Sequence, residues 1–220
     1  SVAPALAPGA EQACGAAALL ELGRHLMTHP PNRTVILLFT SGHFQNLSGM
    51  RHFVPLLQAS RKKSDRTWSS SERKLIQRLS EYHIRMFIGL DLSSGSHLVG
   101  VQKPRSPYRV PLLAPPVTSR LMDLASTYED SVLDGRQILA NGLKQDLSRQ
   151  ALGGLLQTIP VDAAVASLAG CPSLVFTTVN DSRARTDSPL DLPSSVATHR
   201  LAGQVAFLQY LISGLINDLD

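Results

Sequence analysis

The polar side chains that could do chemistry are concentrated in three loops, each of which follows an apolar, strand-like run. The loops span residues 41–49, 91–96 and 180–189. Their imidazole, amide, carboxylate and guanidinium groups belong to the following residues: His43, Gln45, Asn46, Asp91, Asp181, Arg183, Arg185 and Asp187. Because ligands of open α/β sheets bind beyond the carboxyl ends of the strands, we expect these loops to line a cleft.

A metal centre is one chemistry that such a cleft could hold. Zinc needs several His, Cys, Asp or Glu side chains that converge on one point. The first loop supplies a single histidine, His43, and the second a single carboxylate, Asp91. The third loop places arginines between aspartates, and a guanidinium beside a metal ion repels it. Ordinary loop polarity is therefore favoured over a zinc site through His43 and Asp91.

Nucleophilic catalysis has little support from the sequence. The Gly-x-Ser-x-Gly elbow and the two glycine-rich phosphate-binding motifs are absent. A thiolate pair between Cys14 and His43 is conceivable, but nothing places the two together, and Cys14 is expected to pack on its helix as a small apolar residue. Cys14 and Cys171 form either two buried thiols, which is favoured, or one disulfide.

Composition indicates a globular protein. The 220 residues are 43 % hydrophobic and only 17 % charged, which argues against a disordered chain or a coiled coil. The longest apolar stretch, 196–216, is interrupted by charged and amide side chains and is unsuited to crossing a membrane. The net charge of +4 is modest, and its concentration in residues 61–74 is typical of a solvated loop rather than a nucleic-acid surface.

Strands alternating with helices predict an α/β fold. Continuous apolar and β-branched runs predict strands at 33–40, 84–92, 97–102 and 172–179. Helical spacing of apolar residues predicts helices at 13–27, 50–59, 72–82 and 194–216, and a glycine-interrupted helix at 118–157. The five prolines of 103–116 exclude regular structure there. We expect one domain over residues 1–220, with a mobile basic loop at about 60–71.

Four stretches in this order resemble the catalytic domain of the zinc aminopeptidases of clan MH. That superfamily also contains glutaminyl cyclases and the non-catalytic ectodomains of nicastrin and the transferrin receptor. The stretches are PGAEQACGAAALLELGRHL (8–26), RTVILLFTSGHFQNLSGMRHFV (33–54), IGLDL (88–92) and AGCPSLVFTTVNDSRARTDSPLD (169–191). The resemblance implies a three-layer domain, with helices on both faces of a mostly parallel twisted sheet. The family's usual upstream strands are not part of this sequence.

Carried over through these motifs, the family's metal site is largely replaced. The bridging aspartate falls near Glu11, the general-base glutamate on His43, the neighbouring ligand glutamate on Phe44, the third acid on Asp91 and the last histidine on Arg185. Phe44 cannot coordinate zinc, and Arg185 would bring a permanent positive charge where a neutral imidazole should lie. The family's first histidine would lie upstream of Ser1. The resemblance therefore implies a degenerate metal site without a cofactor.

The favoured hypothesis is an inactive peptidase-like domain that binds a protein or peptide, or another domain of the same parent protein. The candidate cleft residues are His43, Asn46, Asp91, Arg185 and Asp187. Arg185 could hold a partner's carboxylate, or could pair with Asp187 or Asp181 in its own loop. The alternative is a divergent zinc-dependent aminopeptidase or hydrolase that uses His43 and Asp91. A third reading has the basic segment 61–73 docking to acidic lipid headgroups.

The resemblance also suggests a location. Superfamily members that have lost their ligands usually lie outside the cytoplasm, beside membrane-spanning segments. We therefore expect an extracytoplasmic part of a larger membrane protein, with no nucleic-acid partner. Asn-x-Ser/Thr matches at Asn32, Asn46 and Asn180 are compatible with secretion.

Overall fold

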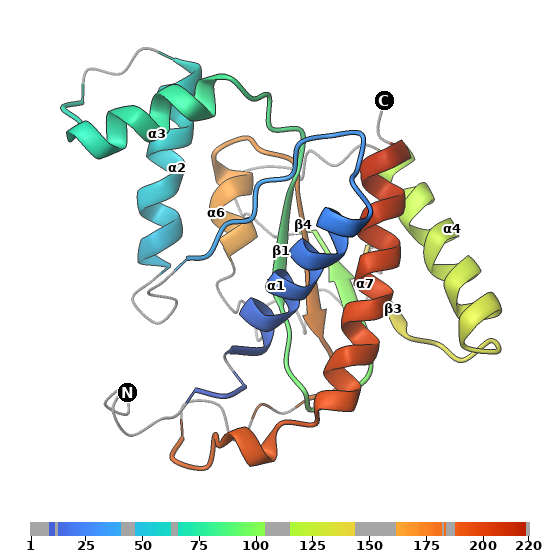
Figure 1. The fold of residues 1–220 in the computed structure, drawn as a ribbon. Coiled ribbons are helices and arrows are strands. Elements are labelled where there is room, and N and C mark those ends of the chain that lie inside the picture. Colours follow the sequence, from blue (N-terminus) through green and yellow to red (C-terminus); the bar gives the residue numbers. More distant parts are fainter. Residues whose placement is uncertain are drawn as a thin grey trace, which may run out of the picture.

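The computed structural model describes residues 9–11, 13–40, 47–62, 66–103, 115–143, 162–181, 183 and 188–218 (Figure 1). Helices and one short sheet make up this part of the chain. The α-helices are α1 (Ala13–Thr28), α2 (Ser48–Arg61), α3 (Ser70–Ser80), α4 (Pro115–Val132), α6 (Asp162–Leu168) and α7 (Thr198–Asp218). The strands are β1 (Phe87–Asp91), β2 (Val99–Gln102), β3 (Leu139–Asn141) and β4 (Ser173–Thr178). The α/β class predicted from the sequence is confirmed.

The four strands form a mixed sheet in the order β1-β4-β2-β3. β1 pairs in parallel with β4, and β2 in parallel with β3, whereas β2 runs antiparallel to β4. Two of the three pairings are thus parallel, as in the predicted mostly parallel sheet, and the pairing of β2 with β4 departs from it. A parallel crossover needs a dozen or more residues, and the link between Asp91 and Val99 is too short to provide one. β2 must consequently enter the sheet in the opposite direction.

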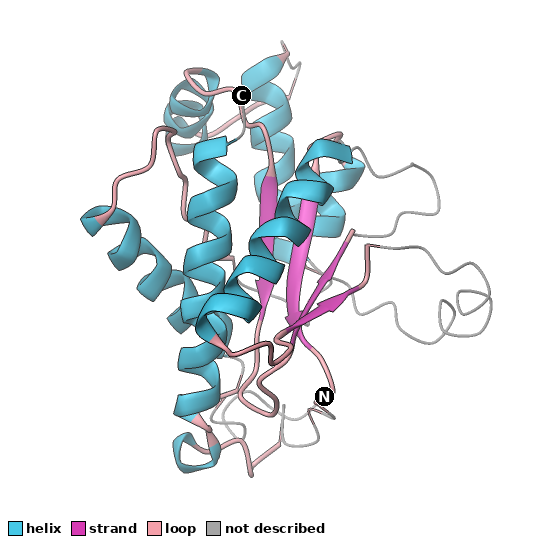
Figure 2. Cartoon of the chain, turned by 90° about the vertical axis from the view of Figure 1, so that its right-hand side faces the viewer, coloured by secondary structure: helices cyan, strands magenta, loops and turns pink. Residues whose placement is uncertain are grey.

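Helices pack on both sides of β1. Ile88 and Leu90 lie against the larger apolar cluster, which contains the buried residues of α1, α4 and α7. Between them, Gly89 faces α6, where a Cβ atom at position 89 would lie 3.2 Å from Cβ of Ala163. Because successive residues of a strand point to opposite faces, α1 and α6 cover opposite faces of β1 (Figures 1 and 2).

The structure corrects the prediction of a strand at residues 33–40. In the structure this segment belongs to no sheet, and none of its backbone groups bonds to another backbone group of the described chain. Val35 and Leu38 pack against the apolar clusters, but Ile36 and Phe39 are 45 % and 51 % exposed. The β-branched composition favours an extended chain, but a strand also requires a neighbour with which to pair.

Several element boundaries also differ from prediction. The predicted helix at 118–157 ends at Val132, and β3 follows it; residues 144–157 lie outside the described chain. α4 begins at Pro115, inside the stretch predicted to be irregular, because the first turn of a helix needs no proline N–H. α7 begins at Thr198 rather than 194, after a short 3₁₀ turn at Pro193–Ser195. The short helix α6 was not predicted.

The helix boundaries in the structure define the extent of the loop predicted at 60–71. α2 extends to Arg61, and α3 begins after Ser69, whose side chain forms a capping box with Glu72. The predicted loop is therefore shorter than expected at both ends. Among the helices described, none is long and apolar enough to cross a membrane.

The packing of α7 makes a direct prediction. Leu211 is fully buried in the larger cluster, whereas Leu190 is 67 % exposed. Leu211→Ala should lower the free energy of unfolding by about 2–5 kcal/mol, because it removes buried contacts and leaves a cavity. Urea unfolding of both variants measures the effect. The matched Leu190→Ala control should stay within about 0.5 kcal/mol of the parent chain; equal losses would contradict the packing described.

Candidate functional site

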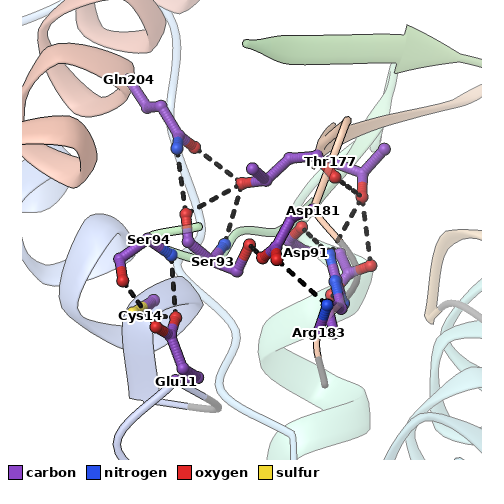
Figure 3. Close-up of polar contacts among 10 residues, drawn as sticks. Glu11, Cys14, Asp91, Ser93, Ser94, Thr177, Asp181, Arg183 and Gln204 are labelled. Carbon is purple, nitrogen blue, oxygen red and sulfur yellow. Dashed lines mark hydrogen bonds and ion pairs between the residues drawn. The ribbon is translucent and has the colours of Figure 1, made fainter. Parts of the chain in front are cut away.

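Polar side chains from four segments meet at the carboxyl ends of β1 and β4 (Figure 3). Asp91, the last residue of β1, lies opposite Thr177 of β4 in the parallel register. The loop after β1 carries Ser93 and Ser94, and the loop after β4 carries Asp181 and Arg183. The start of α1 adds Glu11 and Cys14, and α7 adds Gln204. The predicted meeting of strand-end loops is thus seen for the two loops that the structure describes in this region.

Both carboxylate oxygens of Asp91 accept hydrogen bonds. Arg183 donates from Nη1 to Oδ1 at 2.7 Å, and the Thr177 hydroxyl lies 3.3 Å from Oδ2. Nη2 of Arg183 also donates to the backbone oxygen of Asp91 at 2.9 Å and to Oγ1 of Thr177 at 3.2 Å. The two charged side chains are about a quarter exposed. A permanent cation therefore rests on Asp91 in a partly shielded position.

The backbone around Arg183 fixes that cation in place. Arg183 has a left-handed φ of 50°, which is uncommon for a residue with a side chain. Its N–H donates to Oδ1 of Asp181 at 3.0 Å, and the Ser93 hydroxyl donates to Oδ2 of Asp181 at 2.5 Å. A Cβ atom at Gly95 would lie 2.2 Å from the Asp181 carboxyl carbon, so only glycine allows this approach. Asp181 thus joins the two loops.

The pKa of Asp181 is lowered, which fits this role. Burial acts to raise its pKa, but the hydrogen bonds from Ser93, Arg183 and Gly95 and the positive charge of Arg183 together prevail. The carboxylate therefore stays ionised to a lower pH than in the unfolded chain. Its contribution to stability is present above the unfolded pKa and is lost as the pH falls through the folded pKa.

Glu11 is a second carboxylate at this edge whose two oxygens both accept hydrogen bonds. Its Oε2 accepts the Ser94 N–H at 2.8 Å, and its Oε1 accepts the Ser94 hydroxyl at 2.5 Å. The same hydroxyl oxygen accepts the N–H of Ala197 at 2.9 Å, just before α7. Glu11 therefore ties the beginning of α1 to the loop after β1 and to the approach to α7.

Asp191 closes the beginning of α1 from a distant part of the chain. This residue is completely buried, and its Oδ1 accepts the Glu11 N–H at 2.7 Å. That N–H lies two residues before Ala13, the first residue of α1, whose own N–H donates to the Gly9 carbonyl at 3.0 Å. The other oxygen, Oδ2, has no hydrogen-bond partner among the described residues. The segment before α7 thereby fastens the approach to α1.

The Cys14 thiol lies beneath this carboxylate cluster. It is 2 % exposed, and its Sγ is 3.6 Å from Oε2 of Glu11. Burial, together with the negative charges of Glu11, Asp191 and Asp181, raises the pKa of Cys14 to about 12. A thiol with such a pKa remains protonated at neutral pH and is a poor nucleophile. Cys14 and Cys171 are both free and buried, as the favoured sequence interpretation predicted.

Gln204 of α7 holds the loop after β1 from the other side. Its amide Nε2 donates to the backbone oxygens of Ser93 at 2.9 Å and Ser96 at 2.6 Å. Its Oε1 lies 2.8 Å from the hydroxyl of Thr178, which in turn accepts the Ser93 N–H at 2.8 Å. Gln204 and Thr178 are buried, so these bonds satisfy groups that water cannot reach.

Comparison with solved structures identifies proteins of similar fold. Two structures of BSAP, a zinc aminopeptidase from Bacillus subtilis, superpose with TM-scores of 0.56 and 0.55 at 15 % identity. Both comparisons cover 96 % of this chain and 43 % of the aminopeptidase chain, so this chain spans less than half the length of either. This chain has a peptidase-like fold. No protein-family model matches the sequence, and neither does any curated protein.

The residues that the described part brings together do not fit a zinc centre. Within the residues described, no group of three or more His, Cys, Asp or Glu side chains could hold a metal ion. Asp91, the one clear ligand position implied by the resemblance, is paired with Arg183. A zinc site needs at least three protein ligands, and the described residues bring together no such set around Asp91.

The described residues include some of the predicted site residues and leave others out. His43, Asn46, Arg185 and Asp187 lie outside the described residues, so their predicted roles stay predictions. Glu11 and Asp91 do lie at one edge of the sheet, as the resemblance implied. Arg183 was named among the polar residues of its loop but not among the candidate cleft residues, and it is the residue that contacts Asp91, whereas the last histidine of the family was carried over to Arg185. Two arginines so close in one loop cannot be told apart by spacing.

The environment of Cys14 predicts that its thiol reacts slowly in the folded protein and faster in the unfolded chain. At pH 8 the native chain should react with a thiol reagent such as dithionitrobenzoate far more slowly than the same chain in denaturant. Because the folded pKa is raised, stability should fall as the pH rises above the usual thiol range, where only the unfolded thiol ionises.

Glu11→Gln tests the cause of that shift. Removing the neighbouring negative charge should lower the pKa of Cys14, measured by the thiolate absorbance near 240 nm in a Cys171→Ala background. A fast-reacting Cys14 in the folded parent chain would contradict the burial described.

Proposed function

We propose that this chain is a catalytically inactive peptidase-like domain that binds a protein or peptide partner at its strand-end loops. In this proposal the ancestral metal site is degenerate, and the retained acids serve a structural purpose. The partner is either a separate protein or another domain of the same parent protein.

The ion pair between Asp91 and Arg183 is the observation that carries the proposal. A guanidinium stays protonated at every physiological pH and cannot give way to a metal by losing its proton. For Asp91 to bind a cation, Arg183 would have to leave three acceptors: the Asp91 carboxylate, the Asp91 carbonyl and the Thr177 hydroxyl. A metal ion entering beside Arg183 would also meet its charge at close range.

Glu11 supports the same interpretation independently. Its two oxygens hold the N–H and hydroxyl of Ser94, and releasing them would leave those partly buried donors unpaired. Glu11 and Asp91 each fasten one strand-end loop, so both acids act as hydrogen-bond acceptors within the protein. The result is a fixed platform from which the neighbouring loops can contact a partner.

The proposal assigns the contacts to loop residues whose chemistry suits peptides. Arg185 is assigned a carboxylate of the partner, because a guanidinium binds carboxylates through two parallel hydrogen bonds. His43, Asn46 and Asp187 supply further donors and acceptors. The chain is placed outside the cytoplasm, as part of a larger membrane protein, in line with the superfamily members that have lost their metal ligands.

Metal content and peptidase activity test the proposal together. We expect the purified, undialysed protein to contain far less than one zinc per chain by elemental analysis. We also expect no hydrolysis of leucine p-nitroanilide when zinc is added, with a known zinc aminopeptidase as the positive control. Near-stoichiometric zinc with hydrolysis would overturn the proposal in favour of a divergent hydrolase.

Asp91→Asn distinguishes a structural acid from a metal ligand. Because Arg183 would lose its charged partner, the variant should lose about 1–3 kcal/mol of unfolding free energy. Its metal content should not change. Thr177→Val removes the 3.3 Å contact to Asp91 and the 3.2 Å contact to Arg183 but keeps the ion pair, so this matched control should have the smaller effect. A drop in bound zinc with unchanged stability would contradict the structural role.

A further inference from the structure

Positive charge is unevenly distributed along the chain. Residues 51–85 contain nine of the 21 basic residues and only three of the 17 acidic ones, which gives this stretch a net charge of +6. The rest of the chain has a net charge of −2. The overall excess of positive charge therefore comes entirely from one contiguous stretch, which spans most of α2, all of α3 and the link to β1.

We call α2, α3 and the described residues 62, 66–69 and 81–85 the basic lobe. α3 packs against α2 and lies across its carboxyl-terminal end, to one side of the sheet (Figure 1). The lobe's described basic residues are all exposed: Arg51, Arg61, Lys62, Arg66, Arg73, Lys74, Arg78 and Arg85. Arg51 lies in the first turn of α2, whereas the other cations lie at the carboxyl-terminal end of α2, on α3 or in the segments next to α3.

Most of this charge is not neutralised within the lobe. Glu72 accepts the Ser69 N–H in the capping box and lies 3.5 Å from His52. Arg73, Lys74 and Arg78 form no ion pair with any carboxylate of the described chain. Unpaired surface cations favour an anionic partner, because binding releases their counterions and screens their mutual repulsion.

Apolar and aromatic side chains lie among these cations. Leu75 is 39 % exposed and Tyr82 42 % exposed. Arg66 stacks over the ring of Trp68 at 4.6 Å from its centroid. An open hollow of about 610 Å³ runs along the outer face of α3, lined by Ser71, Lys74, Leu75, Gln77, Arg78 and Glu81. Tyrosine and tryptophan beside lysine and arginine are typical of membrane–water interfaces.

α3 and the strand-end site lie at opposite ends of β1. β1 begins at Phe87, directly after the segment that follows α3, and ends at Asp91 in the site. A surface that contacts α3 would therefore lie away from Asp91 and from the loops after β1 and β4. The two regions could be occupied at the same time, and neither needs the other.

We propose that the basic lobe docks on the surface of an anionic lipid bilayer. A bilayer fits better than an acidic protein segment because the cations, apart from Arg51, are spread over α3, the end of α2 that it crosses and the segments beside them. The hollow on α3 offers Lys74 and Arg78 to a headgroup phosphate, and Leu75 to the apolar region beneath it. Leu79 of α3 faces inward and is buried, so the helix binds at the surface without inserting its apolar face.

Co-sedimentation with lipid vesicles tests this docking. The full chain should bind vesicles with about 30 % phosphatidylserine and not pure phosphatidylcholine vesicles, and the binding should disappear in about 0.5 M NaCl. Lys74→Gln/Arg78→Gln should lower the partition coefficient about thirtyfold, since each cation near an anionic membrane contributes about a factor of five. Circular dichroism checks that each variant is folded.

A matched control distinguishes an effect of the lobe from an effect of the net charge of the chain. Arg24→Gln/Arg136→Gln removes the same charge from exposed positions outside the lobe and should leave binding within about twofold of the parent. Equal losses in both double variants, or equal binding to neutral vesicles, would overturn the proposal. So would binding of a fluorescent polyglutamate peptide without binding of vesicles, which would assign the lobe to an acidic protein.

Asp91→Asn separates this proposal from the proposed function. Asp91 lies at the far end of β1 from α3, so the variant should keep its vesicle binding whatever its effect on the strand-end site. Loss of vesicle binding in Asp91→Asn at a temperature where the chain stays folded would contradict independent docking. Zinc in the parent chain would overturn the inactive-domain proposal and leave lipid binding unaffected.

Discussion

The contact between Arg183 and Asp91 is the constraint on which the strand-end region depends. It joins the carboxyl end of β1 to the loop after β4, and it does so through both a carboxylate and a backbone carbonyl. The pair is partly shielded from water, so removing either partner leaves a charge that water only partly compensates. Arg183 in turn needs Asp181, and Asp181 needs the absence of a side chain at Gly95. The geometry of both loops follows from this chain of requirements.

The remaining polar contacts extend this constraint to the helices. Asp191 and Glu11 hold the start of α1, while Gln204 holds the loop after β1 against α7. These residues are far apart in sequence, and each one satisfies groups that would otherwise be buried without a partner. These contacts restrain the side chains of the site, so the partner proposed above would meet groups that are already ordered.

The fold could be predicted from the sequence wherever an element is determined by the residues within it and next to it. α1, α2, β1, β2 and β4 follow from apolar periodicity and from helix-stopping or turn residues, and they were predicted within a few residues. The segment 33–40 was predicted wrongly because pairing depends on distant residues that a local pattern does not contain. α6 and β3 are too short to show a period. In the site, Asp91 was found from its place after a strand, whereas Arg183 required knowledge of the loop's left-handed backbone.

The unpaired segment 33–40 has a consequence for the colloidal behaviour of the protein. Its N–H and C=O groups bond to no backbone group of the described chain, and Ile36 and Phe39 are exposed beside them. Extended backbone that belongs to no sheet of the described chain, with exposed apolar side chains along it, is a template on which another chain can add a strand. Such addition would grow steeply with concentration. The solubility of this chain should therefore respond to substitutions at Ile36 and Phe39.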